Sequence, residues 1–280
     1  MWRIPKPVIT ALEAFDTCRA GISTPELAQR LEEIREDIAE AEAEFDAAAT
    51  LADLLQIAPA DDVAGIVTAK EMEKLYDRHM ARSKARGRPI YDKLMIAAPH
   101  DQCPFCGHRN VSTLDHTLPK AQHPTLAVTP ICLIPCCKDC NHTKGNLVLG
   151  SAEEQLLNAY YDDVENERWL YAEIVEGSPP GAKFFVETPE EMDIVIACRI
   201  ENHFETLDLA KLYASQAGRQ LQNMKGALAG IYDAAGFAAV RQDLQRRAAS
   251  FAEVSVNSWE GTMLEAAAAS DWYCDGGFRA

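Results

Sequence analysis

Residues 115–146 read DHTLPKAQHPTLAVTPICLIPCCKDCNHTKGN. This stretch begins with an aspartate beside a histidine and ends in closely spaced cysteine, asparagine, histidine and lysine residues. From Cys103 to Asn146 the chain is short of helical periodicity and rich in cysteine, histidine, proline and threonine, so we expect a compact module that carries a functional site. The residue types fit two kinds of metal site: a zinc site that holds a small fold together, and a site at which a metal ion takes part in cleavage.

Two Cys-x-x-Cys pairs lie in this module, Cys103 with Cys106 and Cys137 with Cys140. Two intervening residues allow both thiolates of a pair to face one cation, and four thiolates complete the tetrahedral shell of a structural zinc ion. Cys136 competes with its neighbour Cys137, and we favour Cys137 because it keeps the two-residue spacing to Cys140. The spacing therefore predicts a four-cysteine zinc site, with reduced core cysteines as the alternative.

Between the two cysteine pairs, short apolar runs indicate strands. Residues 111–114 form a β-like run, and residues 131–134 are suited to pair with it in the antiparallel sense. A helix is expected to start at the second cysteine pair, which gives the order strand, strand, helix. In this arrangement Asp115 and His116 leave the first strand, and Asn141 faces them from the first turn of the helix.

The Asp115-His116 pair, followed by a proline, and the later pattern Cys-x-x-Cys-Asn-x-x-Lys-Gly resemble the HNH (ββα-metal) endonucleases, in the subset with a zinc-knuckle frame. The resemblance covers residues 103–146. It implies that His116 is the general base that activates a water and that Asp115 is a metal-binding carboxylate. It further implies that Asn141 completes the metal site and that Lys144 lies near the phosphate.

Hydrolysis of a phosphodiester independently requires such a set of groups. A neutral histidine is suited to deprotonate water, and a hard divalent cation neutralises the charge that develops on the phosphate oxygens. A carboxylate and an amide oxygen suit Mg²⁺ or Mn²⁺, which keep several waters. We therefore expect two metals: a closed, structural Zn²⁺ and an open, catalytic Mg²⁺ or Mn²⁺ held by Asp115 and Asn141.

One position departs from the family pattern, because Cys132 stands where the family has its middle asparagine. In the family that asparagine braces the loop that orients the histidine, and a thiol is a weak substitute for an amide. We therefore expect a slow site or one braced by another residue. Three functions follow: a DNA endonuclease as the leading hypothesis, a catalytically weak or inactive zinc-stabilised binding or adaptor protein, and an RNase of the same chemistry.

The charge of the chain is unevenly distributed. The 280 residues carry a formal net charge of −16, which is unusual for a protein that binds nucleic acid. Basic side chains nevertheless gather between Lys70 and Lys93, directly before the first cysteine pair. We expect this basic arm, through Lys84, Arg86 and Arg88, to contact phosphates together with His142.

No apolar run is long enough to span a membrane, and the N-terminal residues do not resemble a signal peptide. We therefore expect a cytoplasmic protein without membrane association, in which the nine cysteines are reduced. The family resemblance also implies a restriction or phage-defence effector that works with a partner protein such as an ATPase subunit.

The flanking sequence is mostly helical. Thr24-Pro25 starts an amphipathic helix that runs to Phe45, and Thr68 starts another with a capping box. Further expectations are a short helix over 151–159, a β-hairpin over 168–188, and helices from Thr188 to about residue 269.

The sequence thus predicts an α+β, mostly helical protein. Its three parts are a helical region with the basic arm over 1–98, the ββα-metal module over 99–150, and a hairpin with helices over 151–280.

Overall fold

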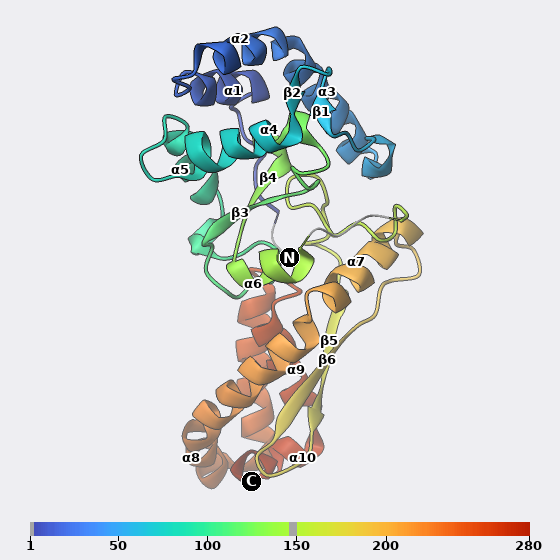
Figure 1. Cartoon of the computed structure of the whole chain (residues 1–280). Coiled ribbons are helices and arrows are strands. Elements are labelled where there is room, and N and C mark those ends of the chain that lie inside the picture. The colour runs from blue at the N-terminus through green and yellow to red at the C-terminus, as the bar shows by residue number, and fades with distance from the viewer. Residues whose placement is uncertain (1–2, 146–149) are drawn as a thin grey trace. The chain divides into compact units, whose positions relative to one another are not determined.

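The computed structural model describes residues 3–145 and 150–280 (Figure 1), so Asn146 lies outside the described residues. The chain forms two compact units, Met1–Asp162 and Asp163–Ala280, which we call the N-terminal and C-terminal units. The expected α+β, mostly helical class is confirmed, with three small antiparallel sheets among the described residues. The sequence-based division at residues 98 and 150 differs from this one, because both positions fall inside the N-terminal unit.

Helices make up most of the N-terminal unit. They are α1 (Ala11–Arg19), α2 (Pro25–Glu33), α3 (Arg35–Thr50), α4 (Ala69–Tyr76), α5 (Arg88–Met95) and α6 (Lys138–Lys144). A hairpin whose strands have two residues each, β1 (Asp62–Val63) and β2 (Val67–Thr68), precedes α4. The capping box expected at Thr68 is present, since its hydroxyl accepts from the Glu71 N–H and the Glu71 carboxylate accepts from the Thr68 N–H.

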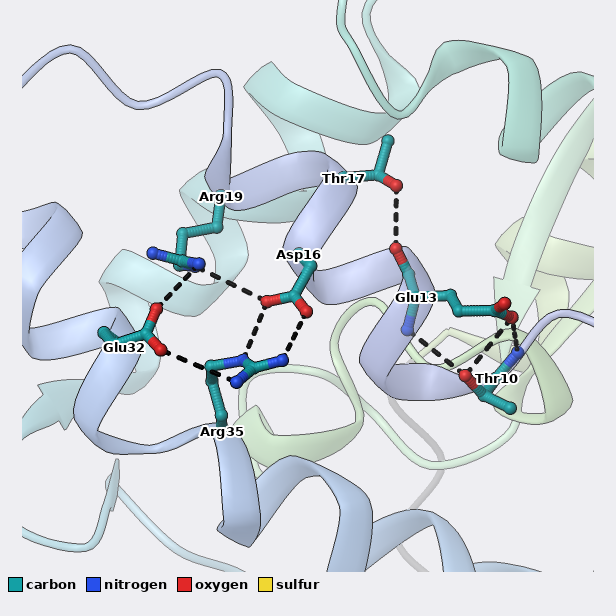
Figure 2. Close-up of polar contacts among 7 residues, drawn as sticks. All are labelled: Thr10, Glu13, Asp16, Thr17, Arg19, Glu32 and Arg35. Atoms are coloured by element: carbon teal, nitrogen blue, oxygen red, sulfur yellow. Dashed lines mark hydrogen bonds and ion pairs between the residues drawn. The ribbon is translucent and has the colours of Figure 1, made fainter.

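The single amphipathic helix expected from Pro25 to Phe45 is instead two helices. Ile34, with φ −97° and ψ 11°, separates α2 from α3. Ion pairs accompany this break (Figure 2): Nε and Nη2 of Arg35 donate to the Asp16 carboxylate on α1, at 2.9 and 2.7 Å. Arg19 on α1 binds Glu32 on α2 at 2.7 Å, so α1 is tied to both helices.

Two short strands and a helix follow in the order expected from the sequence. β3 (Thr113–His116) pairs antiparallel with β4 (Leu133–Cys136), and α6 comes next. Both strands lie two residues later than predicted, so Asp115 and His116 end β3 instead of following it. In Figure 1, α4 and α5 lie toward one end of this pair and α6 lies at the other. Leu114 and Leu133 join the same core as residues of α1, α4 and α5.

The C-terminal unit contains the expected hairpin and a helical remainder. β5 (Leu170–Val175) pairs antiparallel with β6 (Gly181–Val186), and the hairpin packs on α8 (Leu209–Ala252) and α9 (Trp259–Ala269). The remaining helices are α7 (Ile194–Thr206) and α10 (Asp271–Cys274).

Two sequence-based predictions of helices were wrong. Residues 151–159 are turns and irregular chain, although Ser151 suggested a cap. The helix expected at Thr188 begins at Ile194, because the Asp193 carboxylate caps it by accepting from the N–H groups of Val195 and Ile196. No helix in the described parts of the chain has the length and apolar character needed to cross a membrane.

Candidate metal and nuclease site

The four cysteines chosen from their spacing come together in the structure. The Sγ atoms of Cys103, Cys106, Cys137 and Cys140 lie within 4.8 Å of one another, and all four side chains are buried. Gly107 closes the first turn with φ +57°, and its N–H donates to the carbonyl of Cys103 at 2.8 Å. Such a backbone conformation favours glycine.

Hydrogen bonds to sulfur favour the thiolate form that a metal needs. The N–H of Arg109 donates to Cys106 Sγ at 3.4 Å, and the N–H of Cys140 donates to Cys137 Sγ at 3.3 Å. Hydrogen bonds among the clustered thiols, with Cys103 first, lower the pKa of Cys106 and bring that of Cys137 to about 7, while they raise the pKa of Cys103 and of Cys140. Four converging thiolates are the donor set of a structural zinc ion, so the cluster fits zinc.

The competing cysteine lies outside this cluster. Cys136 is buried at the end of β4, and burial raises the pKa of its thiol, which keeps it protonated.

Asp115 of β3 and Lys144 of α6 form a buried ion pair. Only 3% of Asp115 and 9% of Lys144 is exposed. The Lys144 ammonium donates to Asp115 Oδ1 at 3.1 Å and to the His116 carbonyl at 2.6 Å, and it lies 2.9 Å from Asp115 Oδ2. Burial raises the pKa of Asp115, and the Lys144 charge opposes that shift. Asp115 Oδ2 is buried and meets the Lys144 ammonium, so another cation could reach this oxygen only if Lys144 moved.

His116 is held from two sides at the end of β3. Its Nε2 lies 2.9 Å from the carbonyl oxygen of Ala127, and its ring meets the Tyr76 ring edge-on with centroids 4.5 Å apart. Because a carbonyl only accepts, Nε2 carries the proton and Nδ1 keeps its lone pair. Desolvation lowers the pKa of His116 to about 3, so the imidazole is neutral at pH 7. The residue as a whole is partly exposed.

Asn141 borders a different hollow from the cavity that Asp115 lines. With His142 it lines an open hollow on α6, together with Lys138, Asp139 and Gly145. Asp115 and Lys144 line a different cavity of about 20 Å³ that Thr117 and Asn158 also border. Within the described residues, Lys144 is therefore the α6 side chain in contact with Asp115.

Cys132 packs as an apolar residue. It is fully buried among Phe45, Leu54 and Leu126, and burial raises the pKa of its thiol to about 12. Its backbone carbonyl accepts from the N–H of Thr117 at 2.8 Å, which extends the pairing of the two strands beyond His116.

The loop that orients the histidine is thus braced by groups other than an asparagine side chain. The Ala127 carbonyl and the Tyr76 ring hold His116, and the Tyr160 hydroxyl donates to the Leu133 carbonyl at 2.8 Å. Sequence reasoning missed these groups. Tyr76 lies 40 positions before His116 in the sequence, and a backbone carbonyl leaves no trace in the residue types.

The expected basic arm is only partly free. Arg88 is engaged at the start of α5, where it binds Asp92 and the Ala81 carbonyl, each at 2.7 Å. Lys84 and Arg86 lie between the helices, and both are exposed, as is His142 on α6. These three side chains remain candidates for phosphate contacts.

Comparison with known proteins yields one relative. The chain is 34% identical over 170 residues to Protein ea31 of Escherichia phage lambda. The match covers 59% of this chain and 57% of that protein, so the chain spans little more than half of its relative. No family model matches the chain, and no solved structure matches it.

Proposed function

We propose that this chain is a metal-dependent endonuclease of the HNH (ββα-metal) type that hydrolyses DNA phosphodiester bonds. One observation carries the proposal: a buried carboxylate and a histidine whose Nε2 binds the Ala127 carbonyl occupy consecutive positions at the end of β3. The order of the elements also supports the proposal. An antiparallel strand pair, β3 and β4, is followed by the helix α6, as in the family that the sequence resembles, and the chain has a four-cysteine cluster.

His116 acts as the general base. The Ala127 carbonyl holds the Nε2 proton, so Nδ1 is the nitrogen that accepts a proton from the attacking water. The imidazole is neutral at physiological pH, which a base requires before each turnover. The desolvation that keeps His116 neutral also weakens it as a base, so its contribution to the rate lies below the about 10²–10⁴-fold of a base whose pKa matches the working pH.

Asp115 would hold the divalent cation, and Asn141 would join it by turning toward Asp115 from the hollow that it lines. A carboxylate oxygen and an amide oxygen are the hard donors that Mg²⁺ and Mn²⁺ prefer, whereas the thiolate cluster prefers Zn²⁺. When bound, Mg²⁺ or Mn²⁺ supplies positive charge to the phosphate and the leaving oxygen. Lys144, on the same helix as Asn141, would contact the phosphate.

Exposed basic side chains of the N-terminal unit would bind the DNA. Lys84, Arg86 and His142 offer phosphate contacts, while the acidic remainder of the chain repels the polyanion. Binding through so few cations is expected to weaken with salt. This arrangement is consistent with delivery by a partner protein, and a role in restriction or phage defence with an ATPase subunit stays a prediction from the resemblance.

A second candidate is a zinc-stabilised binding or adaptor protein without activity. The closed Asp115–Lys144 pair favours it, because this contact occupies the proposed metal-binding carboxylate. The replacement of the family asparagine by Cys132 points the same way.

Nicking of supercoiled plasmid by the zinc-loaded chain in Mg²⁺ or Mn²⁺ tests the proposal. His116→Ala is expected to abolish nicking. The matched control is His100→Asn, which changes an exposed histidine at φ +56°, a conformation that asparagine tolerates. Equal trace cleavage by the wild type and His116→Ala would refute the nuclease and favour the adaptor, and cleavage of labelled RNA but not DNA would identify an RNase.

A further inference from the structure

The Lys144 ammonium takes the place of a bound cation at Asp115. It contacts three oxygens: Asp115 Oδ1 at 3.1 Å, Asp115 Oδ2 at 2.9 Å and the His116 carbonyl at 2.6 Å. A lysine ammonium has three donors and no acceptor, and here all its contacts are with oxygens. A hard metal ion also binds oxygen ligands, so the two cations compete for the same kind of site. Both oxygens of the carboxylate are within reach of the ammonium.

Space beside this ion pair is too small for a hydrated cation. The cavity that Asp115 and Lys144 line measures about 20 Å³, which is room for about one water. Mg²⁺ keeps several of its waters and demands near-octahedral geometry. A divalent ion therefore cannot join Asp115 while the Lys144 ammonium stays in contact with it.

We propose that Lys144 is an internal counter-cation that closes Asp115 until a divalent ion displaces it. The inference rests on the proposed function, because it takes Asp115 as the ligand of the catalytic metal. While Lys144 stays in contact with Asp115, its positive charge compensates the buried carboxylate. On opening, the four-carbon stem of Lys144, at the last position of α6, carries its charge away from Asp115. Metal binding and the ion pair are mutually exclusive, so they oppose each other thermodynamically.

Direct metal titration tests this competition without any nuclease assay. Zinc-loaded wild-type chain and Lys144→Met are titrated with Mn²⁺, and free Mn²⁺ is followed by electron paramagnetic resonance. Methionine keeps most of the length of the side chain but removes its charge. We expect Lys144→Met to bind one Mn²⁺ at least about tenfold more tightly than wild type, which corresponds to about 1.4 kcal/mol.

Two controls assign the effect to Asp115. Lys93→Met removes an exposed charge on α5 and should leave the Mn²⁺ affinity of wild type unchanged. Asp115→Asn combined with Lys144→Met should lose the tight binding. Equal affinity of wild type and Lys144→Met, or tighter binding by wild type, would overturn the competition while leaving the nuclease proposal intact. No Mn²⁺ binding by either protein would overturn both.

A second readout uses the wild-type chain and does not depend on the folding of a variant. Amine acylation followed by peptide mass spectrometry reports how accessible each lysine is. Lys144 should be protected without divalent ion and should become at least about threefold more reactive at saturating Mn²⁺, as judged against Lys93 within the same chain. Unchanged protection of Lys144 in the presence of bound Mn²⁺ would overturn the displacement.

Discussion

Replacing Asp115 by asparagine should destabilise the N-terminal unit by about 3 kcal/mol. The substitution leaves the Lys144 ammonium buried at 9% exposure without its counter-charge. Breaking one partner of a buried pair typically costs about 3–5 kcal/mol. The lower end applies here, because the His116 carbonyl still accepts from the ammonium at 2.6 Å and the new amide oxygen keeps one acceptor. Asp115→Leu, which offers no acceptor, should approach about 5 kcal/mol.

Urea unfolding of the zinc-loaded chain measures this cost. With a slope of about 1–3 kcal/mol per molar urea, a loss of about 3 kcal/mol lowers the midpoint by about 1–3 M. Trp169, Trp259 and Trp272 all lie in the C-terminal unit, so tryptophan fluorescence mainly follows that unit while far-UV circular dichroism follows both. The shift is therefore expected in the circular dichroism transition.

An exposed aspartate–lysine pair supplies the matched control. Asp77 binds Lys120 at 2.6 Å, with side chains 56% and 25% exposed, so Asp77→Asn should cost less than about 1 kcal/mol. Adding Lys144→Met to Asp115→Asn should recover most of the lost stability, because no unpaired charge then remains buried. The reasoning is wrong if Asp115→Asn and Asp77→Asn shift the transition equally.

Three other outcomes follow from the contacts around the site. Cys140→Ser should reduce zinc, measured by elemental analysis, from about one equivalent per chain to a small fraction, and unchanged zinc content would argue against the four-sulfur site. Tyr76→Leu removes the ring that meets His116 and should slow plasmid nicking about fivefold, from a loss of about 1 kcal/mol, while Tyr76→Phe stays near wild type. The hydrogen bond from Arg30 lowers the pKa of Glu71 from 4.5 to about 2, so this stabilisation is present above pH 4.5 and is lost as the pH falls toward 2. Glu71→Gln should accordingly flatten the fall of the melting temperature across that interval, and an unchanged slope would contradict the assignment.

Local spacing made the sulfur cluster predictable from the sequence. Two cysteines separated by two residues fit one turn of chain, so the choice of Cys137 over Cys136 needed no knowledge of the fold. The order of two strands and a helix was also predictable, because alternation and turn residues act over a few positions.

Contacts that depend on the path of the whole chain were not predictable. Nothing in the residue types shows that Lys144 turns inward to Asp115 while Asn141, one turn earlier, lines another hollow. The edge contact of Tyr76 with His116 joins residues 40 positions apart, and only the folded chain brings them together. Likewise, the predicted cap at Ser151 carries no helix, because capping residues are equally common in turns.

The strands that carry Asp115 and His116 share their hydrophobic core with α1, α4 and α5. Strands of four residues and a helix of seven bury little surface by themselves, so this segment depends for stability on the surrounding helices as well as on any zinc ion. Residues 99–150 taken alone would therefore lose both this packing and the ring of Tyr76 that meets His116. Substitutions in the core of the N-terminal helices would therefore also shift β3, and with it His116, although the helices and this histidine lie far apart in the sequence.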